Sequence, residues 1–108
     1  MLKKSYKLFF GTLANNQRLE IINLLRKGQK NVTQICKEFG FNQTTVSHHL
    51  AILKKCSFVF VEKDGKERVY YLNKKTIKPL MELIDNHTEE FCEYLCGCKS
   101  KNNGGNKQ

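Results

Sequence analysis

Apolar residues recur every three or four positions in five stretches of the chain, a spacing that places them on one face of an α-helix. The pattern predicts helices at residues 3–13, from Asn15 or Asn16 to Gly28, at 32–39, at 43–55, and from Lys74 or Thr76 to about Cys96. Residues 58–63 and 66–72 are instead rich in β-branched and aromatic residues, which favour strands. The chain is therefore predicted to be mainly α with one β-hairpin.

Capping residues define the two central helices more closely. Asn31 and Gln34 have the spacing of a capping box, in which each side chain accepts a hydrogen bond from the backbone N–H of the other residue. Gly40 can adopt the left-handed conformation that ends a helix, and Asn42 can cap the next helix almost at once. Two short helices joined by so tight a turn form a helix-turn-helix.

Asp64 and Gly65 separate the two predicted strands and are a strong signal for a short hairpin turn. A helix-turn-helix followed by a basic hairpin is the outline of a winged helix. The predicted fold is thus a winged helix-turn-helix with the element order α-α-α-α-β-β-α. It would form one domain over residues 1–98, followed by a polar tail at 99–108 that contains no apolar residue and is expected to be disordered.

The predicted helix at residues 43–55 has one apolar face and one face of small polar groups. The apolar side gathers Val46, His49, Leu50, Ile52 and Leu53, and the opposite side gathers Thr44, Ser47, His48, Ala51 and Lys55. A helix that enters the DNA major groove needs short hydrogen-bonding groups in its first turns and positive charge where it meets phosphate. The alternative is a solvated helix that happens to be rich in Thr and Ser. The capped helix before it and the hairpin after it favour DNA binding.

We predict three groups of DNA contacts. Base edges or nearby phosphates would be contacted by Gln43, Thr44, Ser47 and His48, phosphates by Lys54 and Lys55, and the DNA backbone or minor groove by Lys63, Lys66 and Arg68 of the hairpin. For the hairpin residues the alternative is a solvated charged tip. His49 lies nearer the apolar seam and is expected to be a core or hinge histidine.

The charge balance is consistent with a polyanionic partner. The chain has 108 residues, with 19 Lys and Arg against 10 Asp and Glu, and a formal net charge of +9. Such an excess attracts polyanions but identifies neither a fold nor a target sequence. An anionic membrane surface is the alternative, yet no apolar stretch is long enough to span a bilayer and no basic amphipathic helix is evident. The N-terminal residues lack the apolar run of a signal peptide, so a cytoplasmic location with reduced cysteines is expected.

Four segments resemble the ArsR/SmtB family of repressors. They are residues 13–19 (Leu-Ala-Asn-Asn-Gln-Arg-Leu), 32–35 (Val-Thr-Gln-Ile), 45–50 (Thr-Val-Ser-His-His-Leu) and the Asp-Gly wing, and the likeness covers roughly residues 6–72. The resemblance implies a dimer of winged helices that represses an operon, commonly for metal or metalloid resistance, and releases DNA when an inducer binds. Ser57 stands where the family often has a helix-ending glycine, which predicts a different angle at which the chain enters the wing.

The amphipathic pattern also favours a dimer. The first and last helices each carry an apolar stripe that a small helix-turn-helix core cannot fully cover. If these helices packed against their copies, a two-fold dimer would present its recognition helices to successive major grooves about 34 Å apart, which implies a palindromic operator. In the alternative arrangement, the stripes close over their own monomer.

Three cysteines, Cys92, Cys96 and Cys98, lie close together near the end of the last predicted helix. Cys92 and Cys96 are four residues apart and share a helix face, and Gly97 could turn Cys98 back toward them. Three thiolates so placed could bind a soft ion, trigonally for As(III), Cd(II) or Pb(II), or with a fourth ligand for Zn(II). The alternatives are thiols without a function and a redox switch in which two of them form a disulfide.

The resemblance places the best-known cysteine site of the family at residues 28–31, which contain no cysteine here, so Cys36 and Cys56 are expected in the core. The predicted function is a repressor that releases a palindromic operator when a soft ion binds the C-terminal cysteines. A winged-helix regulator without metal sensing, a non-specific DNA-packing protein and a domain that recruits a partner remain alternatives. Catalysis is not expected, because Ser47 and His48 are consecutive on a helix and diverge.

Overall fold

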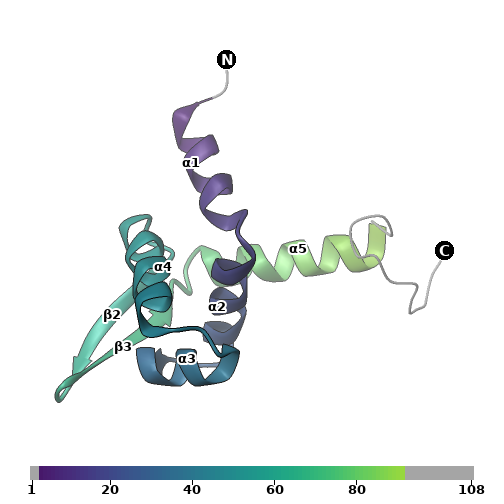
Figure 1. Cartoon of the computed structure of the whole chain (residues 1–108). Helices are drawn as coiled ribbons and strands as arrows, with labels where there is room; N and C mark the ends of the chain where they lie inside the picture. Colours follow the sequence, from purple (N-terminus) through teal and green to yellow (C-terminus); the bar gives the residue numbers. More distant parts are fainter. Residues whose placement is uncertain (1–2, 92–108) are drawn as a thin grey trace. The chain divides into compact units, whose positions relative to one another are not determined.

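The computed structural model describes residues 3–91 (Figure 1). The chain divides into two compact units, one up to Asn73 and one from Lys74 onward. The first contains α1 (Lys4–Leu13), α2 (Asn16–Arg26), β1 (Lys30–Asn31), α3 (Val32–Phe39), α4 (Gln43–Lys55), β2 (Val59–Asp64) and β3 (Glu67–Leu72), and the second contains α5 (Ile77–Phe91). The predicted fold class is confirmed. The single domain over residues 1–98 stays a prediction, and the tail at 99–108 lies outside the described residues.

An apolar core lies among α2, α3, α4 and the strands of the first unit. Its most deeply buried side chains are Ile21, Ile22, Ile35, Val46, Leu50, Leu53, Phe58, Val59 and Leu72. Each contributes about 1.5–3 kcal/mol to folding by leaving water. Figure 1 shows α3 and α4 adjacent, with the hairpin next to α4. The predicted apolar seam of α4 is therefore the side that fixes this helix in the fold.

Asparagine side chains cap the N-termini of three helices. At α4, Asn42 Oδ1 accepts a hydrogen bond from the backbone N–H of Thr45 at 2.8 Å. Asn15 caps α2 in the same way, and Asn31 forms the predicted capping box of α3 with Gln34. An asparagine cap is worth about 1 kcal/mol relative to alanine. The caps thus define where each helix begins.

The hairpin turn lies one residue later than the sequence predicted. β2 and β3 pair antiparallel with Asp64 opposite Glu67, so Gly65 and Lys66 form the turn, and Asp64 belongs to the strand. Gly65 has a φ of 67°, which suits glycine at the first position of a two-residue turn. The register matters because successive strand residues point to opposite faces.

A third strand, β1, was not predicted. Lys30 pairs with Tyr70 and Asn31 with Val69, which makes a three-stranded sheet in the order β1-β3-β2. Two residues are too few to show an alternating pattern, and Asn31 also caps α3. This strand joins the start of the helix-turn-helix to the wing.

A Schellman motif carries the chain from α4 into the wing. Ser57 N–H donates to Lys54 O and Phe58 N–H donates to Leu53 O, both at 2.9 Å. The left-handed position in such a motif usually holds glycine, but here Ser57 occupies it with a φ of 60°. Ser57 therefore ends the helix as a glycine would, at a strain of about 1–2 kcal/mol. The predicted difference in the angle of the wing stays a prediction.

Up to Phe91, the last residue that the structure describes, the second unit contains one amphipathic helix. In α5, Ile77 and Met81 are buried, whereas Leu83, Ile84 and Phe91 are exposed. The continuation predicted to about Cys96 lies outside the described residues. Among residues 3–91, no helix is both long and apolar enough to cross a membrane.

Candidate nucleic-acid interface

The outward face of α4 carries the residues predicted to contact bases. Gln43, Thr44, Ser47 and His48 are all exposed, and all lie in the first two turns after the cap. They display amide, hydroxyl and imidazole groups, which can donate to or accept from base edges. The structure thus brings the four side chains to one end of one helix. Their contact with bases stays a prediction.

The end of α4 carries positive charge. Lys54 and Lys55 lie in its last turn, and both are exposed. Cations at this end of a helix interact favourably with its dipole, so their placement costs little. The partners predicted for these two lysines are phosphates of the DNA backbone.

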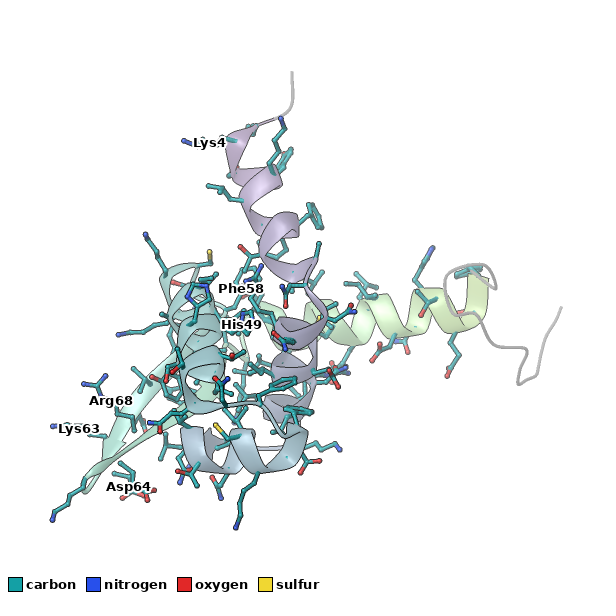
Figure 2. All side chains as sticks on the ribbon, in the orientation of Figure 1. Lys4, His49, Phe58, Lys63, Asp64 and Arg68 are labelled. Atoms are coloured by element: carbon teal, nitrogen blue, oxygen red, sulfur yellow. The ribbon has the colours of Figure 1, made fainter. Side chains whose placement is uncertain are left out.

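The two faces of the wing carry opposite charges. Lys63 pairs across the hairpin with Arg68, and the next pair, Asp64 with Glu67, points to the other side. Figure 2 shows Lys63 and Arg68 on one side of the hairpin and Asp64 on the other. Like charges directly opposite each other are destabilising, and a nearby phosphate would relieve that repulsion. The basic face therefore suits a polyanion, and Lys66 lies at the turn beside it.

A hydrogen bond ties the acidic face of the wing to the helix-turn-helix. Asn31 Nδ2 donates to Glu67 Oε1 at 2.7 Å, while Asn31 Oδ1 caps α3 through the backbone N–H of Gln34. One side chain thus fixes both the start of α3 and the second strand of the wing. The sequence predicted only the cap, because Glu67 lies far away along the chain.

His49 is buried on the inward side of α4, as predicted for a core histidine. Its side chain is only 6% exposed (Figure 2). The Nε2 atom lies 2.8 Å from Gln17 Oε1, and Nδ1 lies 3.4 Å from Arg18 Nη1. Because arginine has only donors, Nδ1 must accept. The proton of the neutral ring then lies on Nε2, which donates to Gln17.

The surroundings of His49 favour the neutral ring. Burial lowers its pKa from the ordinary value of 6.5, and the positive charges of Arg18 and His48 lower the pKa further. Arg18 also donates through Nε to the carbonyl oxygen of Thr12 in α1 at 2.7 Å, so one guanidinium links α1 to α4. Gln17 and Arg18 were not predicted as part of the site. The only sequence signal was their place in the segment that resembles the repressor family.

Comparisons with known proteins agree with this geometry. The family described as "Bacterial regulatory protein, arsR family" matches residues 15–60. The cadmium resistance transcriptional regulatory protein CadC of Listeria innocua is 37% identical over 83 residues, which are 76% of this chain and 70% of that protein. This chain belongs to the ArsR family.

Two further comparisons extend beyond the helix-turn-helix of this ArsR-family protein. An arsenical resistance operon repressor of Staphylococcus xylosus is 28% identical over 104 residues, 96% of this chain and 98% of that one. The homodimeric winged helix-turn-helix DNA-binding domain of a possible ArsR-family regulator from Mycobacterium bovis is 27% identical, with a TM-score of 0.75. It covers 90% of this chain and 87% of the M. bovis chain. The ArsR-family protein is thus a DNA-binding transcriptional regulator of the repressor class and not an enzyme, as predicted.

The cysteines of the ArsR-family protein divide into two groups. Cys92, Cys96 and Cys98, the predicted metal ligands, lie outside the described residues. Within residues 3–91, no group of three or more His, Cys, Asp or Glu could hold a metal ion. Cys36 is half-buried, but Cys56 is exposed, so its predicted core position is wrong. It is the residue that follows the last turn of α4.

Proposed function

We propose that this ArsR-family protein is a dimeric repressor that binds a palindromic operator through two α4 helices. It releases the operator when a soft metal or metalloid ion binds Cys92, Cys96 and Cys98. The observation that carries the DNA-binding part is the division of α4. An apolar seam holds the helix in the core and leaves Gln43, Thr44, Ser47 and His48 facing outward.

Exposed apolar side chains support the dimer. On α1, Tyr6 and Phe10 are four residues apart on one face and are 50% and 61% exposed. On α5, Leu83 and Phe91 are also exposed. Large apolar side chains gathered on a helix mark an interaction surface. The M. bovis domain is homodimeric, and a second copy of this chain is the partner we propose for these faces.

The roles proposed on α4 follow from side-chain chemistry. Gln43 has the donor and acceptor that adenine requires, and His48 can donate to a base acceptor. Ser47 and Thr44 can contact either a base or a nearby phosphate. In a two-fold dimer the same residues are presented twice, so the operator would be palindromic.

The relatives support the class of inducer. One is named for arsenical resistance and another for cadmium resistance. Thiolates are the preferred ligands of such soft ions, and Cys92, Cys96 and Cys98 supply three of them. The thiolates would bind As(III), Cd(II), Pb(II) or Zn(II) more tightly in one arrangement of the two subunits, and that arrangement would space the α4 helices wrongly for DNA. A coupling free energy of about 1–3 kcal/mol corresponds to a 5–150-fold release.

A titration tests the inducer. The reduced protein, with residues 92–108 included, is bound to a palindromic duplex selected from a random DNA pool, and Zn(II), Cd(II), Pb(II) or As(III) is added. At least one ion should lower the DNA affinity 5–150-fold in the wild type. The triple variant Cys92→Ser, Cys96→Ser, Cys98→Ser should keep its affinity at every ion concentration. Cys56→Ser is the matched control and should respond as the wild type does.

Three outcomes contradict parts of this proposal. If no ion changes the DNA affinity of the wild type, the protein is a winged-helix regulator without metal sensing. If no duplex is selected over random sequence, it is a DNA-packing protein and the operator is wrong as well. Sedimentation velocity over a range of concentrations tests the dimer, which a monomer at all concentrations would exclude.

A further inference from the structure

We propose that His49 is a positioning residue whose effect on DNA binding depends on its protonation. The neutral ring, which lies between Gln17 and Arg18, keeps α4 in the arrangement that fits the operator. Protonation of the ring weakens operator binding. The inference rests on the DNA binding of the family and requires no inducer. It concerns a buried side chain that contacts no base.

The geometry makes His49 the polar link between the recognition helix and the rest of the first unit. Two residues of α2 form hydrogen bonds with its ring: Gln17 Oε1 lies 2.8 Å from Nε2, and Arg18 Nη1 lies 3.4 Å from Nδ1. The remaining inward side chains of α4 are apolar and form a non-directional contact. The two hydrogen bonds therefore add a directional constraint on the orientation of α4 to the packing of its apolar seam.

Arg18 extends this link to α1. Its Nε donates to the carbonyl oxygen of Thr12, in the last turn of α1, at 2.7 Å, while Nη1 faces His49. The Thr12 hydroxyl donates to Leu8 O at 2.7 Å and then accepts from the thiol of Cys56, 3.5 Å away, at the end of α4. The end of α1 is thus linked to α4 twice, once through Arg18 of α2 and once directly through Cys56. Loss of the Arg18 contact would free the middle of α4 while its end stays anchored.

Protonation of His49 changes its contact with Arg18 and leaves its contact with Gln17 unchanged. The neutral ring accepts at Nδ1 and donates at Nε2, which satisfies both partners. A proton added at Nδ1 would turn its lone pair into an N–H that faces the guanidinium of Arg18, so a hydrogen bond would be replaced by repulsion between two cations. From α2 the charged group that faces the ring is Arg18, and from α4 it is His48, with ring centroids 5.7 Å apart. Both disfavour a second positive charge.

The weaker operator binding expected in acid is the opposite of what net charge alone would cause. Acidification adds positive charge to the protein, which by itself strengthens binding to a polyanion. His48 is exposed on the outward face of α4. His49 is its immediate neighbour on α4, and displacement of its ring would move the outward face relative to the rest of the domain. A loss of operator affinity in acid would therefore oppose the general trend, as protonation of the inward ring predicts.

The experiment measures operator affinity from pH 8 to pH 5 at constant ionic strength, with the intact chain, a chelator and reductant present. Wild-type affinity should fall only as the pH drops below 6.5, because the pKa of His49 in the folded protein lies below that value, and by at most roughly tenfold per pH unit for each His49. His49→Gln keeps one donor and one acceptor but cannot be protonated in this range, so it should lack the fall. His48 is present in both proteins, so its contribution cancels in the difference.

A second variant keeps the test decisive if His49→Gln does not fold. Gln17→Glu places a carboxylate beside Nε2, which raises the pKa of His49, so the loss of affinity should begin at a higher pH. Asn16→Asp adds the same charge to the first turn of α2 at an exposed position and should leave the profile of the wild type unchanged. Circular dichroism at each pH checks that every variant remains folded.

Three results would overturn the proposal. The first is an operator affinity of the wild type that does not fall in acid. The second is the same fall in folded His49→Gln, which would assign the effect to other groups. The third is a profile for Gln17→Glu that matches Asn16→Asp. Because no metal is added, none of these outcomes depends on the inducer proposed for the cysteines.

Discussion

His49 on α4 donates through Nε2 to the side-chain oxygen of Gln17 on α2, across a distance of 2.8 Å and a separation of 32 residues in the chain. This contact joins α4, the helix that we propose contacts DNA, to α2. The next residue along the chain, Arg18, meets the other nitrogen of the same ring. The recognition helix is therefore oriented by a polar contact as well as by apolar packing.

Removal of this ring should destabilise the protein. His49→Ala leaves Arg18 and Gln17 without their partner in a part-buried site, which costs about 1–3 kcal/mol for an unsatisfied group. His49→Gln can keep both hydrogen bonds and should lose less. Urea denaturation measures the free energy of unfolding for each. Equal losses for the two variants would show that ring packing, and not hydrogen bonding, is what His49 contributes.

The stability of the protein should also depend on pH through His49. Its pKa is lowered below 6.5 in the folded state, so the unfolded chain binds the proton more readily. The stabilising contribution is therefore complete above pH 6.5, is lost as the pH falls from 6.5 toward the folded pKa, and is constant below it. The test compares urea midpoints at pH 7.5 and pH 5 in the wild type and in His49→Gln. The wild type should lose more stability, and an equal loss would contradict the assignment.

Ser57→Gly should stabilise the protein by about 1 kcal/mol. The left-handed conformation of Ser57 strains a residue with a side chain, whereas glycine adopts it freely, although glycine also gains entropy in the unfolded chain. Ser57→Ala is the matched control, because alanine suffers the same strain and should leave the unfolding free energy nearly unchanged. Thermal denaturation of the wild type and the two variants measures the difference in stability. A glycine variant no more stable than the alanine variant would exclude strain.

Ser47→Ala and His48→Ala should reduce operator preference while leaving most non-specific binding. A good base contact contributes about 1–3 kcal/mol of discrimination, and neither side chain belongs to the core. Lys54→Ala should behave differently. It should weaken operator and random duplexes alike and lower the salt slope by about 1. Competition binding at several salt concentrations separates the two patterns, and a Ser47→Ala variant that weakens both duplexes equally would make Ser47 a phosphate contact.

Phe10→Glu should convert the proposed dimer to a monomer. It puts a charge on the exposed apolar face of α1, which a second copy would have to desolvate. Ser5→Glu adds the same charge to an exposed position of the same helix and should preserve the dimer. Sedimentation equilibrium gives the association constant of each. A Phe10→Glu protein that still dimerises would place the interface elsewhere.

Local sequence signals were enough for the helix-turn-helix. The caps at Asn31 and Asn42 and the two faces of α4 all appear where the chain pattern predicted them, since a cap needs only residues three apart and an apolar face only helical periodicity. The wing was predicted with its turn one residue early. Asp64 is a favourable turn residue, but its pairing with Glu67 keeps it in the strand. The strand β1 was not predicted because two residues are too few to show a periodic pattern.

The sequence by itself determined the order of the five helices and the two wing strands, the outward polar face of α4 and the excess of positive charge. Periodicity, capping and net charge are properties of neighbouring residues or of the whole composition. Only the tertiary structure decided the conformation of Ser57, the opposite charges on the two faces of the wing and the partners of His49. The conformation of Ser57 depends on the hydrogen bonds that close the end of α4 before the wing. The charges of the wing depend on strand register, and the partners of His49 on contacts between residues about thirty positions apart. The position of a proton on a buried ring is set by those distant partners, and no local pattern in the chain records them.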